Sequence, residues 1–134
     1  MHLLLLAFLG ACATAPQAPA TEAGGLRFTI EPRVVAPGGA VTLVLFNDTA
    51  AEIGFNLCMS ALERREGSSW VAAPQQGACT RELRIAAPGR DARYQRVLPA
   101  ALASGEYRFR TSVESPLMQA RMQPLASESF AVRR

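Results

Sequence analysis

The chain has 134 residues, of which 49% are hydrophobic and 19% are charged. This length predicts one domain, and the apolar content is sufficient for an ordinary buried core. The formal net charge is only +3, and all 14 basic residues are arginines that are scattered along the chain. Such a balance argues against nucleic-acid binding, which uses a clustered basic surface. It is compatible with weak attraction to anionic lipid or polysaccharide.

An apolar run opens the chain from His2 to Ala11 and ends at a cysteine, Cys12. With about nine apolar positions, the run falls short of the roughly 20 that cross a bilayer, so it predicts an export signal rather than an anchor helix. Leu9-Gly10-Ala11-Cys12 resembles the lipobox of bacterial lipoproteins. The resemblance implies that residues 1–11 are removed, that Cys12 is lipidated, and that the protein is held to a membrane, which we expect to be the outer membrane, facing the periplasm. An ordinary secretory leader is the alternative, and both predict export.

The segment from Ala13 to Gly25 is rich in Pro, Ala, Thr and Gly and has no large apolar residue. Such a segment buries too little surface to offset its ordering entropy. We therefore expect residues 12–25 to form a lipidated cysteine followed by a flexible tether.

Residues 26–134 predict an all-β domain, because short alternating or β-branched runs are separated by Gly/Pro turns and no amphipathic helix is evident. Two of the runs are expected to form a central hairpin, closed by the polar turn Glu63–Ser68. The segment Pro116–Pro124 is expected to be a long connection. The predicted strands are Leu26–Ile30, Ala40–Phe46, Ile53–Leu62, Trp70–Ala72, Glu82–Ile85, Ala92–Leu98, Tyr107–Val113 and Ser127–Val132.

About seven or eight short strands at this spacing are typical of an immunoglobulin-like antiparallel β-sandwich with Greek-key connections. The turn and core residues resemble bacterial immunoglobulin-like domains of secreted and lipid-anchored proteins. They are also similar in outline to the bacterial intracellular proteinase inhibitor family. The residues that carry the resemblance are Glu31-Pro32, Pro37-Gly38, Val41, Leu43, Leu45, Asn47, Leu62-Glu63, Trp70, Pro88-Gly89 and Gly105 to Phe109. The resemblance implies a fold for residues 26–134 but no activity.

The segment from Leu102 to Tyr107 is similar to the tyrosine corner of Greek-key sandwiches. In that pattern a tyrosine near a strand start donates a hydrogen bond to backbone a few residues upstream. Leu102 and Gly105 belong to the pattern, and the glycine is expected to let the chain turn sharply. A plain core tyrosine is the alternative.

With Cys12 assigned to lipid, Cys58 and Cys79 remain as a pair in an oxidising compartment. We expect them to form a disulfide that closes a loop of about 20 residues and adds roughly 3 kcal/mol to stability. The alternatives are a redox pair or a soft Cu(I) site. That site would draw on both cysteines and on Met59, Met118 and Met122.

No catalytic site is expected in the mature chain, and no cofactor or metal. Once His2 has left with the leader, neither histidine nor lysine remains as a general base. A further hypothesis places Arg93, Arg108 and Arg110, with Arg96 opposite, on one basic sheet face that meets an anionic envelope polymer. The simpler interpretation is that polar residues cover the outer faces of any sandwich.

A binding surface, if the domain has one, is expected in end loops carried on the rigid sheets. The candidates are the hairpin tip with Arg64, Arg65 and Trp70, and the Pro74–Cys79 loop with Gln75 and Gln76. The functions that follow are a non-catalytic, lipid-anchored module that binds a protein or an envelope polymer, a protease inhibitor acting through the loop beside the disulfide, or a Cu(I) carrier.

Overall fold

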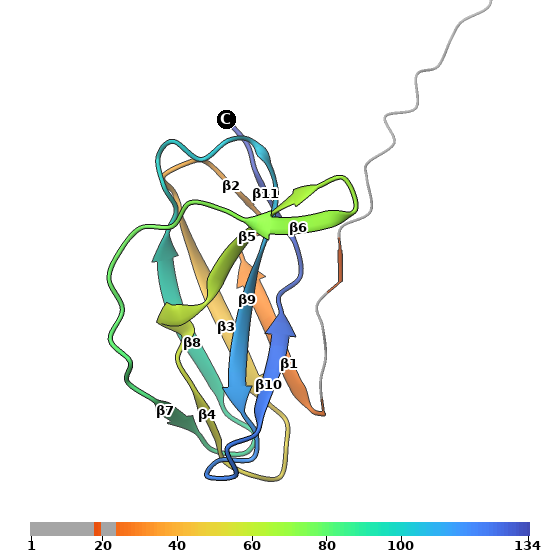
Figure 1. The fold of residues 1–134 in the computed structure, drawn as a ribbon, viewed down its shortest axis with the longest axis vertical. Helices are drawn as coiled ribbons and strands as arrows, with labels where there is room; N and C mark the ends of the chain where they lie inside the picture. The colour runs from red at the N-terminus through yellow and green to blue at the C-terminus, as the bar shows by residue number, and fades with distance from the viewer. Residues whose placement is uncertain (1–17, 20–23) are drawn as a thin grey trace, which may run out of the picture.

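The computed structural model describes residues 18–19 and 24–134 (Figure 1). The predicted signal peptide, Cys12 and most of the predicted tether lie outside these residues. The described part is all-β, with a single 3₁₀ turn, η1, at Leu57–Met59. No helix in it is long and apolar enough to cross a membrane. Its strands are β1 (Leu26–Glu31), β2 (Val34–Val35), β3 (Ala40–Asn47), β4 (Ile53–Phe55), β5 (Ala61–Glu66), β6 (Ser69–Ala72), β7 (Arg84–Ala86), β8 (Asp91–Val97), β9 (Gly105–Glu114), β10 (Met122–Ala126) and β11 (Phe130–Val132).

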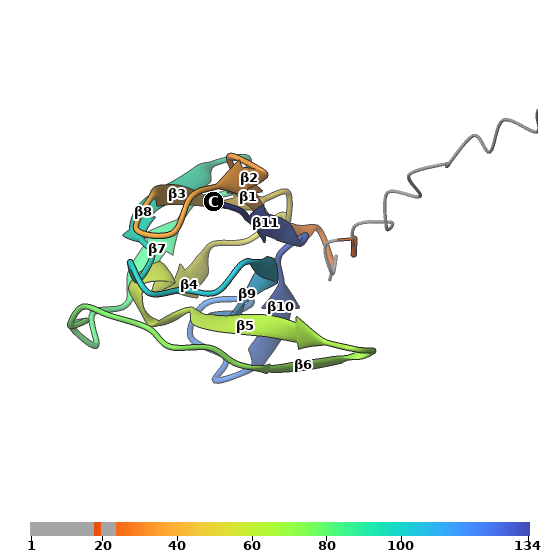
Figure 2. The same ribbon diagram turned by 90° about the horizontal axis from the view of Figure 1, so that it is seen from above.

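The strands form two stacked sheets, which Figure 2 shows from above. The smaller sheet has the order β1-β3-β8. The larger sheet is centred on β9, which pairs with β11 and β10 along one side and with β5 and β4 along the other. Farther from β9, β6 pairs with β5 and β7 pairs with β4. On the other side β2 pairs with β11, and this is the one parallel pair of the described strands. If each position across a sheet is called a lane, three lanes of the larger sheet each contain two short strands placed end to end. These are β11 with β10, β5 with β4, and β6 with β7.

This arrangement confirms the predicted immunoglobulin-like β-sandwich. The smaller sheet has three lanes and the larger has five, which makes eight lanes from eleven strands. The core lies between the sheets, where β9 alternates as predicted, with Tyr107, Phe109, Thr111 and Val113 all buried. Phe109 and Phe130 stack at 5.9 Å between ring centroids. Along each strand the period of two sends every second side chain into this layer.

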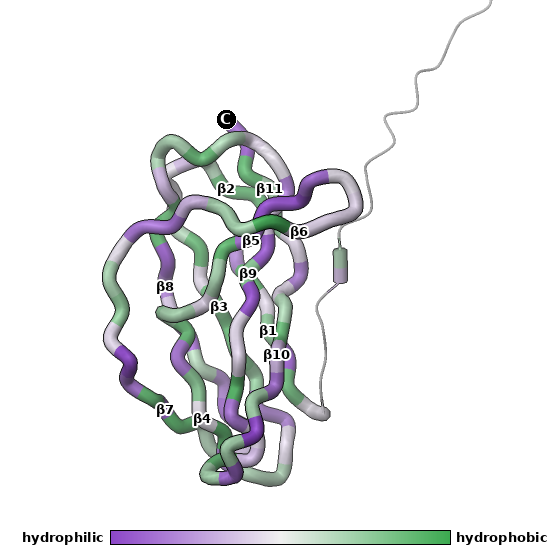
Figure 3. Tube along the Cα trace, in the orientation of Figure 1, coloured by the Kyte–Doolittle hydropathy of each residue, from purple (hydrophilic) through white to green (hydrophobic). Residues whose placement is uncertain are grey.

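The predicted third strand was wrong as a single element. The chain leaves β4 at Asn56, makes the η1 turn and re-enters the sheet as β5. The Asn56 amide donates to the Thr80 carbonyl at 2.8 Å, which ties this break to the distant loop. Glu63 to Glu66, predicted as turn, instead form the last four residues of β5. All four pair with β6, the first two also pair with β9, and this pairing outweighs their polar composition. Figure 3 shows these residues as hydrophilic beside the pale hairpin tip.

The end of the chain also differs from the prediction. The expected connection Pro116–Pro124 contains the start of β10, and the expected strand Ser127–Val132 is reduced to β11. Pro124 is tolerated because the neighbouring ladder bonds fall on odd-numbered residues, as in Ser127 N–H to Phe109 at 2.8 Å. The missing N–H of Pro124 therefore faces away from β9.

Part of the expected tether lies against the domain. The Ala18 N–H donates to the Ser129 hydroxyl at 3.0 Å, and the Ser129 N–H donates to the Ala18 carbonyl at 3.1 Å. A free tether from Ala13 to Gly25 is therefore not what the structure has at Ala18. Composition did not reveal this contact, because Ala18 makes it through its backbone N–H and carbonyl alone.

Candidate functional site

The predicted disulfide joins Cys58 of η1 to Cys79, with their Cα atoms 5.7 Å apart. It ties a long exposed segment between β6 and β7 to the break in the central hairpin (Figure 1). Hydrogen bonds fix the segment at further points. The Leu62 N–H donates to the Gln75 side-chain oxygen at 3.0 Å, and the Asn56 amide donates to the Thr80 carbonyl. The loop is thus largely exposed but attached to the domain by the disulfide and by these bonds.

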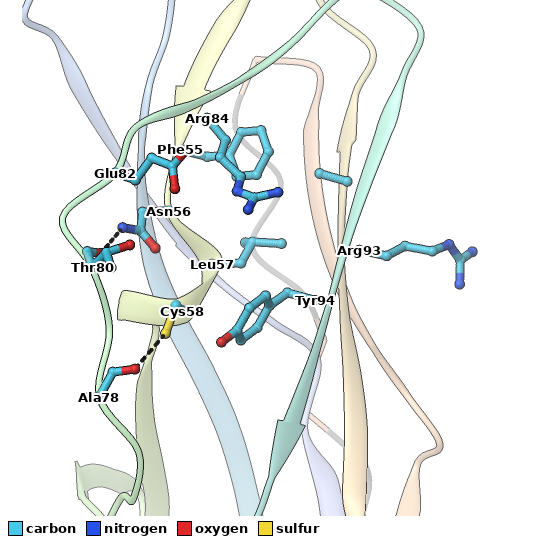
Figure 4. A pocket seen from close by; sticks show the side chains of 11 residues that line it. Phe55, Asn56, Leu57, Cys58, Ala78, Thr80, Glu82, Arg84, Arg93 and Tyr94 are labelled. Carbon is cyan, nitrogen blue, oxygen red and sulfur yellow. Dashed lines mark hydrogen bonds between the residues drawn. The ribbon is translucent and has the colours of Figure 1, made fainter.

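A groove lies between this loop and the edge strand β8 (Figure 4). We call it the β8 groove. It consists of two adjoining hollows of about 420 and 310 Å³, which share Cys58, Ala78 and Tyr94. Ala78 and Thr80 line the loop side, Tyr94 stands on β8, and Leu57 lies between them. The buried side chains of Phe55 and Leu57 form an apolar floor.

The β8 backbone is unpaired on the groove side. β8 pairs only with β3, and the hydrogen-bonded pairs include Asn47 with Arg90 and Leu98 with Gly39. Hydrogen bonding alternates along an antiparallel pair, so the residues bonded to β3 are the even-numbered ones. The N–H and C=O groups of the odd-numbered residues then point outward, and no described backbone group meets them. These residues are Asp91, Arg93, Gln95 and Val97.

Arg96 closes one end of the groove from below. Its register partner is Val41, so its side chain points between the sheets rather than outward. The guanidinium lies over the Phe109 ring at 5.5 Å and donates to the Cys58 carbonyl at 2.6 Å and to Gln75 at 3.3 Å. Burial lowers the Arg96 pKa, and Tyr94 opposes this shift. The guanidinium remains charged, since arginine titrates far above neutral pH.

Several polar side chains of the groove have no hydrogen-bond or ion-pair partner among the described residues. They include the hydroxyl of Tyr94, the guanidinium of Arg84 and the carboxylate of Glu82. The groove therefore combines an apolar floor, an unpaired backbone edge and uncommitted polar groups at its rim. An apolar floor with a few polar groups around it is the usual make-up of a binding site.

The predicted binding residues do not form one surface. Arg65 and Trp70 are opposite each other in the β5–β6 hairpin, and Arg65 pairs with Glu106 at 3.0 Å. Trp70 is covered by the Arg108 guanidinium at 4.4 Å from its ring. Gln75 is exposed, and its side-chain oxygen accepts from the Leu62 N–H and from Arg96.

The other two predicted binding residues lie apart from this pair. Gln76 lines the second hollow of the β8 groove, with its amide 3.5 Å from the Leu98 carbonyl. Arg64 points to the opposite side of β5 from Arg65.

The tyrosine-corner hydrogen bond is present. The Tyr107 hydroxyl donates to the Ala103 carbonyl at 2.7 Å, four residues upstream. Burial raises the Tyr107 pKa, and the positive charge of Arg64 opposes the shift. Gly105 has a different role from the one expected. It is the first residue of β9 and has no left-handed φ, and a Cβ there would stand 3.3 Å from Arg64 Nε. Leu102 is buried close by.

The basic sheet face was wrong. Arg93 lies on the smaller sheet, where it pairs with Asp91 at 3.1 Å, whereas Arg108 and Arg110 lie on the larger sheet. There both pair with Glu63, at 2.7 and 3.5 Å. Arg96 points inward, as described above. The four arginines therefore occupy different faces, and all of them except Arg96 are paired with a carboxylate.

The soft-metal set is also dispersed. Both cysteines are used in the disulfide, so they offer no thiolate. Met59 and Met122 line a shallow hollow of about 570 Å³ on the outer face of the larger sheet, beside Gly54. Met118 is 86% exposed in the turn before β10. Within the described residues, no group of three or more His, Cys, Asp or Glu side chains is placed to hold a metal ion.

Sequence reasoning missed the groove residues Phe55, Tyr94 and Arg84. A signal was present in the predicted strand Ala92–Leu98, whose inward positions are Ala92, Tyr94 and Arg96. An inward-facing arginine indicates a sheet edge that the opposite layer does not cover fully. Locating the opposite wall required the tertiary structure, because that wall comes from residues 76–84.

The chain was compared with protein-family models, curated proteins and solved structures. No protein-family model matches the chain, and no curated protein matches it. Among solved structures, the chain is similar to the ASH/PapD-like domain 7 of human CEP192, with 13% identity and a TM-score of 0.45. The match covers 100% of this chain and 99% of that one. The fold is therefore assigned from the strand pairing of this chain, and its function is argued from the groove.

Proposed function

We propose that the chain is a lipid-anchored, non-catalytic binding module of the bacterial cell envelope, and that its β8 groove receives an extended segment of a protein partner. The lipobox resemblance at Cys12 supports the anchor. The Cys58–Cys79 disulfide supports export, because such bonds persist in oxidising compartments. An immunoglobulin-like sandwich is consistent with a binding or structural role, and its site decides which.

The observation that carries the proposal is the unpaired edge of β8 beside a groove. An extended peptide can add to such an edge as a further strand, with affinity from backbone hydrogen bonds and specificity from alternate side chains. Four β8 residues present outward backbone groups, and Phe55 and Leu57 offer an apolar floor to the inward-facing side chains of the added strand. Arg84 and Glu82 at the rim can pair with polar or charged side chains of the added strand.

The test uses two variants of one residue. Gln95→Pro removes an outward N–H without removing a bond to β3, whereas Gln95→Ala keeps that N–H. Random nine-residue peptides displayed on phage are selected on the immobilised domain, and the selected peptides are titrated against both variants. We expect Gln95→Ala to bind like the wild type and Gln95→Pro to weaken binding about tenfold or more. On binding, the amides of Asp91, Arg93, Gln95 and Val97 should gain protection from hydrogen exchange.

Equal binding by the two variants, or protection confined to the β5–β6 hairpin, would contradict strand addition. A partner that proves to be an envelope polymer would appear as binding of purified peptidoglycan or anionic polysaccharide that Gln95→Pro leaves unchanged. Thermal unfolding of both variants shows whether the proline has disturbed the sheet itself.

The anchor is tested separately. Mass spectrometry of the protein expressed with its leader in a Gram-negative bacterium should find an acylated Cys12 at the N-terminus. Cys12→Ala should move the protein from the membrane fraction to the soluble periplasmic fraction. An unmodified Cys12, or a leader cleaved elsewhere, would leave an exported domain without this anchor.

A second candidate function is protease inhibition through the loop between β6 and β7. The observation that favours it is the loop's attachment at Gln75, Cys79 and Thr80 while its side chains stay exposed. A loop held in this way resists cleavage after docking. Incubation with a panel of envelope proteases tests it. Inhibition of a protease at about micromolar concentrations of the domain, absent in the double variant Cys58→Ser/Cys79→Ser, would support this function. No inhibition of any protease in the panel would exclude it.

A further inference from the structure

Another pocket, of about 290 Å³, lies at the end of the sandwich next to the tyrosine corner. We call it the corner pocket. It shares no lining residue with the β8 groove. Its walls are mostly apolar, and Arg64 and Glu66 contribute its charged groups. The apolar lining includes Val71, Pro74, Pro99, Leu102 and Ala103, together with the ring of Tyr107.

Arg64 is unusual among the half-buried arginines because its guanidinium has no partner. Its Nε is buried and makes no hydrogen bond with any described group. The two Nη atoms also lack a partner, but they are not buried. By contrast, Arg96 donates to backbone carbonyls, and Arg108 pairs with Glu63. Holding an unpaired guanidinium against apolar walls costs free energy. A hydrogen-bond acceptor from a bound ligand would reduce this cost.

The fold holds this side chain in the pocket. Arg64 pairs with Tyr107 in the β5–β9 ladder and therefore shares its face, which is the inner one. Gly105 supplies the room, since a Cβ at that position would lie 3.3 Å from Arg64 Nε and 3.7 Å from Nη2. The neighbouring Arg65 faces the other way and is committed to Glu106. Arg64 is thus placed by the sheet register rather than left on the surface.

We infer that the corner pocket binds a monocarboxylate that carries a small apolar group, with Arg64 donating to the carboxylate. Guanidinium and carboxylate match in geometry, and each charge-assisted bond between them is stronger than a neutral one. The apolar walls suit an aliphatic substituent. Arg64 and Glu66 together give the pocket no formal net charge, so a singly charged anion is served better than a phosphate dianion.

Two sources could supply this chemistry, the C-terminus of a polypeptide and a free small acid. The probes are N-acetyl-leucine and the peptide N-acetyl-Ala-Ala-Ala-Leu, each with a free carboxylate and each also as the carboxamide. Binding is followed by NMR through the Nε–H signal of Arg64 and the backbone amides of Leu102 and Ala103. A peptide that binds tighter than the single residue indicates a chain end, and equal affinities indicate a small acid.

We expect the carboxylates to bind about tenfold or more tightly than their amides. Arg64→Gln should remove this difference, and Arg65→Gln, one position away on the opposite face, should keep it. The amide comparison uses the wild-type protein, so it stands even if Arg64→Gln fails to fold. The inference is overturned if carboxylate and amide bind equally, if Arg64→Gln retains the preference, or if no probe shifts these signals at about 10 mM. The β8 groove variants leave this test unaffected.

Discussion

Arginine is the only basic residue type in this chain, and each copy depends on what surrounds its guanidinium. Arg27 lies over the Phe46 ring at 4.1 Å on the outer face of the smaller sheet. Arg108 combines an aromatic contact with an ion pair, Arg96 reaches backbone carbonyls between the sheets, and Arg64 has neither. A count of charges therefore says little about which arginine binds a ligand.

The tyrosine-corner hydrogen bond makes a prediction at a single atom. Tyr107→Phe removes the donor to the Ala103 carbonyl and should lower the free energy of unfolding by about 1–2 kcal/mol. Tyr94→Phe is the matched control, because its hydroxyl has no partner among the described residues, and it should change stability by less than about 0.5 kcal/mol. Urea unfolding measures both. Equal effects would show that the corner bond does not stabilise the fold.

The inward arginine makes a second prediction. Arg96→Leu removes donors from the Cys58 and Ser60 carbonyls and should cost about 1.5–3 kcal/mol, the range for hydrogen bonds to a charged group. Arg93→Leu, on the same strand but with exposed ion pairs, should cost about 0–1 kcal/mol. Thermal or urea unfolding distinguishes them. A larger effect at Arg93 would place the important contacts on the outer face instead.

At the scale of elements, broken lanes produce the sites. β4 and β5 follow one lane but are interrupted by η1, which carries Cys58 to the loop that bears Cys79. β7 and β6 are separated by the same loop, so β8 keeps no neighbour on its outer side.

The disulfide makes an element-scale prediction. Replacing both cysteines with alanine opens a loop of 21 residues in sequence separation. The loss should lower stability by about 3 kcal/mol in the chain-entropy model. Hydrogen exchange should accelerate in Gln76–Thr80 much more than in β9, which is paired on both sides. Uniform acceleration would mean that the loop is not a separate unit.

At the scale of the whole molecule, Glu106 links the hairpin to the chain leading into the domain. It accepts from Arg65 at 3.0 Å and from the Ala18 N–H at 3.4 Å. Burial alone would raise the Glu106 pKa, but hydrogen bonds from Ser129, Arg65 and Ala18, with the Arg65 charge, outweigh burial and lower it. The contact therefore holds together three segments that are distant in sequence.

This lowered pKa predicts a pH dependence with a definite sign. A carboxyl whose pKa is lowered in the folded state stabilises the fold at pH values above its ordinary pKa of 4.5. This contribution is lost as the pH falls through the lowered pKa. Glu106→Gln should be less stable than the wild type at neutral pH, and the gap should narrow in acid. Denaturation at several pH values measures this gap. A gap that stays constant or widens in acid contradicts the assignment.

The fold class, the disulfide partners and the tyrosine corner followed from the sequence, because alternation, turn residues and cysteine parity are local or countable. The break at Asn56, the strand character of Glu63–Glu66 and the start of β10 at Met122 did not. In each of these segments, pairing with a distant strand or loop overrode local composition.

Sequence by itself determined which faces are apolar, since a side-chain period of two follows from the backbone alone. Only the tertiary structure decided that β8 has an open edge facing a tethered loop, and that Arg64 rather than Arg65 is without a partner. Both outcomes depend on which strands become neighbours and in what register. That choice is made by contacts between residues far apart in the chain.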